Sequence, residues 1–110
     1  SIPAQSSETV VFDTNVPAGA EVFALTSHTH QLGTYASIHR MADGAEVELL
    51  HESFDWAEPP FDVFQPSLTL APNESLRLTC QFENPTDDAV NFGTSFYDEM
   101  CFLWAHYVEP

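Results

Sequence analysis

Turn-forming residues interrupt the sequence at short intervals, and this spacing constrains the fold more than any other feature. The interruptions fall at residues 17–19, 42–44, 59–60, 72–74 and 84–88 and at Gly93. Proline, glycine, asparagine and aspartate favour turn conformations that end regular elements. The segments between them show no helical periodicity, and most are rich in strand-forming residues. The chain is therefore expected to be all-β.

Alternation of apolar and polar residues identifies the clearest strand. In residues 75–82, apolar side chains occupy every second position and polar side chains the positions between them. A period of two is typical of a strand with one buried face. Further strands are expected over residues 10–12, 21–30, 34–41, 46–51, 62–65, 90–92 and 101–108. This pattern predicts one all-β sandwich or barrel domain over residues 1–110. Residues 1–8 are expected to be a linker or chain end, and residues 51–60 a long loop or irregular edge.

The charge of the chain excludes two classes of partner. Seventeen carboxylates and only two arginines give the 110 residues a formal net charge of −15. Nucleic acids and anionic membrane surfaces both require a basic binding surface, so neither is an expected partner. No apolar run approaches the length of a membrane span. The acids are dispersed, which fits a solvated surface or, alternatively, adaptation to a salty medium.

A pair of histidines is the first candidate for chemistry. His28 and His30 lie two residues apart in an expected strand, so both side chains point to the same face and could bind one metal ion. The alternative is that both are polar residues on a surface strand. Met100 is a candidate third ligand, although a methionine more commonly fills a core. Two imidazoles and a thioether would select copper, and Cu(I) in particular, whereas zinc usually takes a third histidine, a cysteine or a carboxylate.

The two cysteines constrain the compartment. Cys80 and Cys101 are the only cysteines in the chain. They could be two buried thiols, but a disulfide is the favoured interpretation. A disulfide implies an oxidising location, such as the secreted space, a periplasm or a vesicle lumen.

Two motifs together resemble a known family. HTHQLG at residues 28–33, followed by DEMC at residues 98–101, resembles the C-terminal catalytic domain of the copper type II, ascorbate-dependent monooxygenases. That family includes dopamine β-monooxygenase and peptidylglycine α-hydroxylating monooxygenase. The similarity extends over most of the chain, through FALTSHTHQLG, LAPNESLRLTC and FGTSFYDEMCFLWAHYVEP.

The resemblance implies a specific fold and site. It implies an antiparallel, jelly-roll-like β-sandwich with a disulfide between Cys80 and Cys101. It implies one copper, cycling between Cu(I) and Cu(II), on His28, His30 and Met100. This would be the catalytic centre where O₂ binds and a small organic substrate is hydroxylated, with ascorbate or another reductant supplying electrons. Asp98 and Glu99 could orient a ligand histidine or could be solvated.

Departures from the family pattern leave the activity open. Thr26 stands where the peptide-hydroxylating branch has an arginine that anchors the substrate carboxylate. Phe102 and Trp104 follow the Met-Cys pair at positions that help to bind peptide in that branch. A peptide with a C-terminal glycine is therefore not expected as substrate.

The electron-donating domain of the family has no counterpart in the sequence. Family enzymes carry a second copper on a first domain, and here only His39, His51 and His106 remain as candidates for a second site. The chain is thus expected to be half of a monooxygenase that needs a second copper-bearing domain. The alternative is a stand-alone module that binds, stores or senses copper without turnover.

Overall fold

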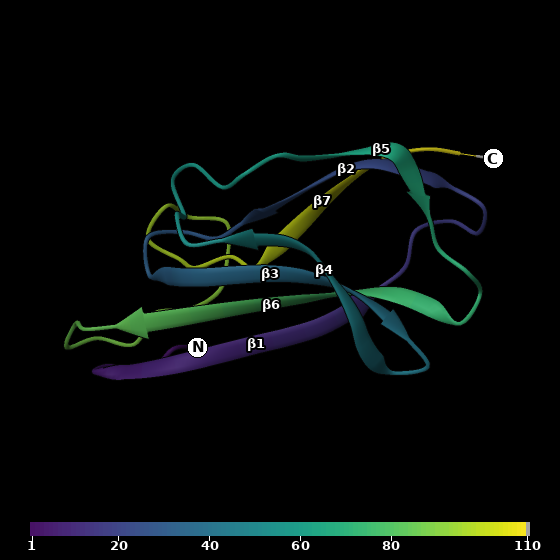
Figure 1. The fold of residues 1–110 in the computed structure, drawn as a ribbon. Coiled ribbons are helices and arrows are strands. Elements are labelled where there is room, and N and C mark those ends of the chain that lie inside the picture. The colour runs from purple at the N-terminus through teal and green to yellow at the C-terminus, as the bar shows by residue number, and fades with distance from the viewer. Residues whose placement is uncertain (110) are drawn as a thin grey trace.

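The computed structural model describes residues 1–109, and every regular element in this range is a β-strand (Figure 1). No helix that could cross a membrane occurs among these residues. The strands are β1 (Ser6–Thr14), β2 (Glu21–His28), β3 (Gly33–Ala42), β4 (Ala45–Ser53), β5 (Asp62–Thr69), β6 (Glu74–Asn84) and β7 (Phe102–Val108).

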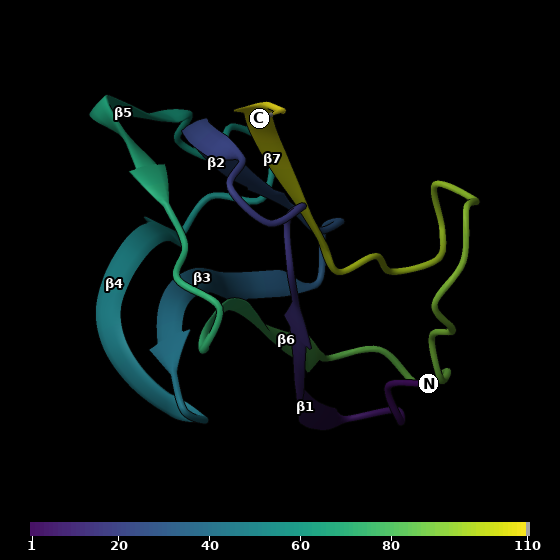
Figure 2. The same ribbon diagram turned by 90° about the vertical axis from the view of Figure 1, so that its right-hand side faces the viewer.

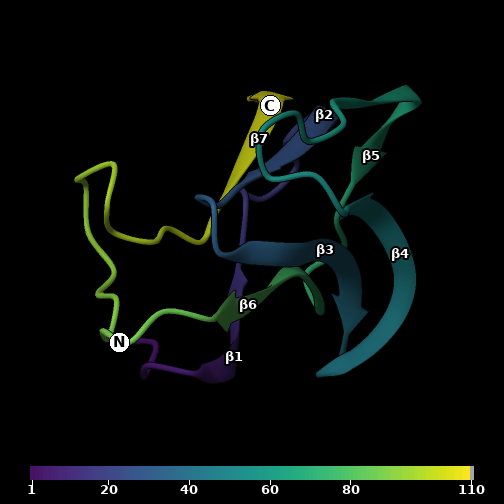
Figure 3. The ribbon, with the colours of Figure 1, turned by 90° about the vertical axis from the view of Figure 1, so that its left-hand side faces the viewer.

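The strands form two antiparallel sheets that stack face to face. One sheet has the strand order β1-β6-β3-β4, and the other has the order β5-β2-β7. Figures 2 and 3 look along the sandwich from opposite ends. They show β4 curving upward on one side and the connection from β6 to β7 extending on the other. The antiparallel β-sandwich expected from the sequence is confirmed.

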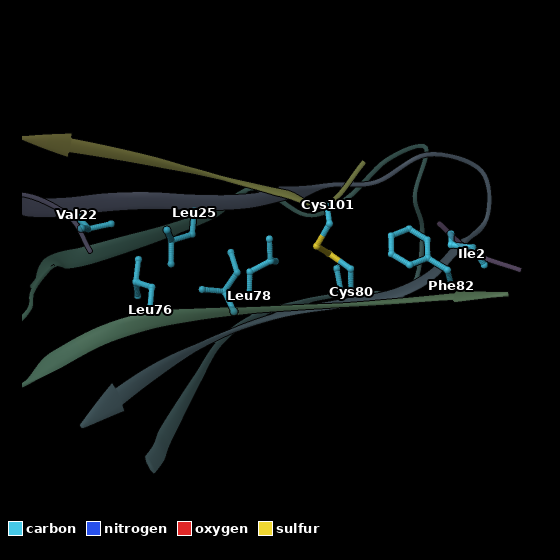
Figure 4. Packing of buried hydrophobic residues seen from close by; sticks show 10 residues of the cluster. Ile2, Val22, Leu25, Leu76, Leu78, Cys80, Phe82 and Cys101 are labelled. Atoms are coloured by element: carbon cyan, nitrogen blue, oxygen red, sulfur yellow. A yellow bond between two sulfur atoms is a disulfide. The ribbon is translucent and has the colours of Figure 1, made fainter. Parts of the chain in front are cut away.

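The core lies between the two sheets and is built from the alternating residues of β6. Leu76, Leu78 and Phe82 are at most 1% exposed and point toward the three-stranded sheet (Figure 4). Val22 and Leu25 of β2 meet them from that sheet. Full burial of each large apolar side chain contributes roughly 1.5–3 kcal/mol. The alternating apolar side chains of β6 therefore form the part of the core that holds the two sheets together.

The beginning of the chain and the connection from β6 to β7 differ from what the sequence suggested. Residues 1–8 were expected to be a linker, but Ile2 is fully buried in the core and β1 already begins at Ser6. Residues 90–92 form no strand and contribute only two isolated bridges, Ile2 to Val90 and Phe92 to Glu99.

Asn84 gives the physical reason for this arrangement. Its side-chain amide donates to the carbonyl oxygens of Ile2, Pro3 and Asp88. Its side-chain oxygen accepts from the main-chain N–H of Thr86 at 3.1 Å. A buried polar side chain therefore orders this region in place of a strand ladder.

The disulfide predicted between the two cysteines is confirmed. Cys80 in β6 and Cys101, directly before β7, are joined by an S–S bond of 2.07 Å. The bond crosses the core and fastens one sheet to the other (Figure 4). Closing a loop of about 20 residues in the unfolded chain is worth roughly 3 kcal/mol on the chain-entropy model.

Replacing both cysteines should test this contribution. The double variant Cys80→Ala/Cys101→Ala is expected to lose about 3 kcal/mol of unfolding free energy, measured by urea denaturation. The wild-type protein unfolded in the presence of a reductant should show a similar loss, because the same loop is released. A variant as stable as the oxidised wild type would contradict this account.

Candidate metal centre

His28 and His30 lie side by side where β2 ends. His28 is the last residue of the strand, and His30 belongs to the turn that leads into β3. Ser27 and Thr29, their inward-pointing neighbours, are buried, so the two histidines point away from the core. The ring centroids are 5.1 Å apart and the ring planes are nearly perpendicular, at 88°. Two imidazoles at this separation can converge on one ion.

The turn after the histidine pair requires a glycine. The Gly33 N–H donates to the His30 carbonyl at 2.9 Å and closes the turn. A β-carbon on Gly33 would lie 2.2 Å from Oγ1 of the buried Thr29. Contacts that short do not occur, so any larger residue would displace the segment that carries both imidazoles. The glycine of HTHQLG is therefore explained by packing.

Glu99 holds the histidine turn against the segment that contains Met100. Its side chain is 1% exposed. One carboxylate oxygen accepts the main-chain N–H of His30 at 2.9 Å, and the other accepts that of Leu32 at 2.8 Å. These two bonds satisfy a buried carboxylate that would otherwise be costly to desolvate.

The main chain of Asp98 sets the tautomer of His30. Nδ1 of His30 lies 2.7 Å from the Asp98 carbonyl oxygen, which can only accept a hydrogen bond. Nδ1 must therefore carry the proton, and Nε2 keeps the lone pair that a metal needs. Sequence reasoning left open whether the two acids orient a ligand. The groups that orient His30 are the Asp98 carbonyl and, through the main chain, the Glu99 carboxylate.

Strand register supports placing Met100 on the same side as the histidines. His28 pairs directly with Phe102 of β7, and side chains that are directly opposite share a face. Met100 precedes Phe102 by two residues, just before β7 begins, and its neighbours Glu99 and Cys101 are buried. Met100 is partly buried, whereas Met41 is a core methionine at 1% exposure. The partial exposure of Met100 distinguishes it from a residue that only fills the core.

The electrostatic environment favours a neutral His28. Partial burial lowers the pKa of His28 below its usual value, the neighbouring His30 lowers it further, and Glu99 opposes the shift. A metal binds the neutral imidazole. The pair is therefore arranged so that a proton competes less strongly for His28 than it would for an isolated histidine.

An apolar groove lies beside Met100. It has a volume of about 370 Å³ and follows the edge between β1 and the start of β7. Phe92 and Phe102 line it. Outside the groove, Tyr35 packs against Phe54, and the ring of Phe96 lies beside that of His30. The remaining groove residues are Val10, Phe12, Gly93, Thr94, Glu99 and Cys101.

Comparison with known families gives a match over nearly the whole chain. Residues 5–110 match the family model described as copper type II ascorbate-dependent monooxygenase, C-terminal domain. The chain belongs to this family.

Relatives of the chain carry the name DBH-like monooxygenase protein 1. The chicken protein (Gallus gallus) is 29% identical over 96 residues, the mouse protein (Mus musculus) 30% over 95 and the human protein (Homo sapiens) 27% over 94. Each alignment covers 83% of this chain. The matched region is 15% of the length of each relative, so the chain corresponds to a small part of those proteins.

The donor set of this family member suits copper. His28 and His30 offer imidazole nitrogens, with Nε2 of His30 left free by the bond to Asp98. Met100 offers a thioether, a soft ligand that favours Cu(I) over harder divalent ions. The residues present therefore fit the metal that the family description names.

The other three histidines do not gather into a second site. His39 lies in β3, with Nε2 3.6 Å from a carboxylate oxygen of Glu46. His51 is buried and hydrogen-bonded through both ring nitrogens. His106 packs against two phenylalanine rings. Within residues 1–109, no group of three or more His, Cys, Asp or Glu residues could hold a metal ion.

Removing the charge of Glu99 should loosen the histidine turn. In Glu99→Gln the amide nitrogen would face one of the two main-chain N–H donors. Because hydrogen bonds to charged groups are worth roughly 1.5–3 kcal/mol, we expect a loss of about 2 kcal/mol in urea unfolding. Glu83→Gln, an exposed substitution in β6, is the control and should stay within about 0.5 kcal/mol of wild type. Equal stability of the two variants would contradict the role given to Glu99.

Proposed function

We propose that this chain is the copper-binding domain on which O₂ and substrate meet in a copper monooxygenase. The proposed ligands are His28, His30 and Met100, with one copper per chain. The observation that carries the proposal is the register of β2 and β7, which pairs His28 with Phe102 and so favours Met100 on the face of the histidines.

The protein's part in the reaction would be to hold the ligands and keep one side of the metal open. Bound copper would supply the one-electron and O₂ chemistry. His30 would bind through Nε2, because the Asp98 carbonyl occupies Nδ1. Glu99 would fix the main chain of the histidine turn. With only three protein ligands, a bound copper ion would still be able to take up O₂.

The surroundings favour a small, uncharged or weakly polar organic substrate. The groove beside Met100 is lined mainly by apolar side chains. The Thr26 hydroxyl donates to the Pro60 carbonyl at 2.7 Å, so this position offers no charged anchor for a carboxylate. Both arginines of the chain lie on the four-stranded sheet and pair with acids there.

A second copper-bearing domain is part of this proposal. The matched region is only 15% of the length of relatives that are named monooxygenases, which leaves ample sequence for such a domain. The monooxygenase names favour half of an enzyme over the stand-alone copper module. The disulfide and these relatives fit an oxidising location, in the secreted space, a periplasm or a vesicle lumen.

A Cu(I) titration tests the proposed ligands. With ascorbate present and a coloured chelator competing, wild type should bind one Cu(I) tightly. Met100→Leu should weaken binding about tenfold or more, which corresponds to at least about 1.4 kcal/mol. Met41→Leu, which changes the core methionine, is the matched control and should bind as wild type does.

Other outcomes would separate the alternatives. Equal affinities for Met100→Leu and wild type would remove Met100 from the site. Two tight copper ions would require a second centre. No tight copper would reduce the family relationship to a shared fold.

A further inference from the structure

A buried chain of hydrogen bonds lies directly beneath the proposed copper site. Ser27 Oγ is 2.8 Å from Nε2 of His51, and Nδ1 of His51 is 2.7 Å from Oδ2 of Asp62. Ser27 is 3% exposed and His51 is 2% exposed. The three residues come from β2, β4 and β5, so the chain crosses from one sheet to the other.

With a neutral His51 ring, the chemistry of the three groups gives the direction of each hydrogen bond. The Asp62 carboxylate can only accept, so Nδ1 of His51 donates to it. Nε2 of the neutral ring then accepts, and the Ser27 hydroxyl donates. Every polar atom of the buried imidazole is therefore satisfied, which makes a network of this kind rigid and specific.

A serine, a histidine and an aspartate in this order also form the catalytic triad of serine hydrolases. The surroundings of Ser27, however, differ from those of a catalytic serine. Ser27 lies within a continuous strand and pairs with Leu103 of β7. The cavity that Ser27 lines has a volume of about 10 Å³, which suits a single water molecule. A substrate cannot reach this hydroxyl, so a nucleophilic role for Ser27 is rejected.

The network lies next to the proposed ligand His28, so it could fix the position of that residue. Ser27 directly precedes His28, where β2 ends and its ladder with β7 ends as well. On the other ligand segment, Cys101 directly follows Met100 and is bonded to Cys80 of β6. In each segment, the residue next to the proposed ligand points inward and is bonded to the four-stranded sheet. Ser27 is hydrogen-bonded to His51 of β4, and Cys101 is disulfide-bonded to β6.

We propose that Ser27, His51 and Asp62 are positioning residues that hold the imidazole of His28 in the geometry required for copper. This inference rests on the proposed function. Without the Ser27 hydroxyl, Nε2 of His51 would be a buried acceptor with no donor, and the strand end would shift or admit water. His28 would then lose its fixed orientation toward His30.

Variants of Ser27 test this inference. Ser27→Ala should lower Cu(I) affinity about tenfold, the lower end of the effect of removing an outer partner of a metal ligand. It should also change the Cu(II) hyperfine coupling in the electron paramagnetic resonance spectrum. Ser27→Thr keeps the hydroxyl and should restore both. Ser37→Ala, which removes a buried serine from β3, is the matched control and should leave both unchanged.

A metal-free measurement separates failure of this inference from failure of the proposed function. Nitrogen-15 NMR of the apoprotein reads the tautomer and environment of each histidine ring. Ser27→Ala should shift the ring signals of both His51 and His28, whereas Ser37→Ala should not. If Ser27→Ala does not fold, Asp62→Asn at the partly exposed end of the network should give the same change with smaller amplitude.

The outcomes are distinct. A wild type that binds no copper would end the proposed function, and the apoprotein NMR would still decide whether the network orients His28. A Ser27→Ala protein that is less stable but keeps the wild-type His28 signals, copper affinity and hyperfine coupling would overturn the positioning role.

Discussion

The antiparallel pairing of β2 with β7 is the constraint on which the site depends. Its register places His28 opposite Phe102, so the two motifs, far apart in sequence, meet at one end of the three-stranded sheet. Ser27 and Thr29, which flank His28 in sequence, are buried, because side chains alternate across a strand. If β7 slipped by one residue along β2, every side chain of β7 would change face. Phe102 would then point into the core, and Cys101 would point away from it.

A buried carboxylate then joins the two segments without the help of a cation. The chain has only two arginines, and both are used on the other sheet: Arg77 binds Asp13, and Arg40 binds Glu48 and Glu74. Glu99 instead takes main-chain N–H donors from the histidine turn. The buried Glu99 side chain is therefore held next to the histidine turn by main-chain hydrogen bonds alone.

Local sequence patterns predicted much of the fold and the candidate ligands. The alternation in residues 75–82 predicted the central strand β6, because one face of that strand is wholly buried. The edge strand β1 was predicted only over residues 10–12, because it is largely exposed and shows little alternation. The link between Ser27 and His51 could not be predicted, since it joins residues 24 apart in sequence and in different sheets. The ligand set of His28, His30 and Met100 stays a prediction.

X-ray absorption at the copper edge of the Cu(I)-loaded protein tests the central claim most directly. We predict a coordination shell of two imidazoles and one sulfur in wild type, and loss of the sulfur contribution in Met100→Leu. The two cysteines are joined to each other, so a copper-bound sulfur in the oxidised protein would identify a methionine. A wild-type shell of nitrogen and oxygen alone would contradict the assignment of Met100 as a ligand.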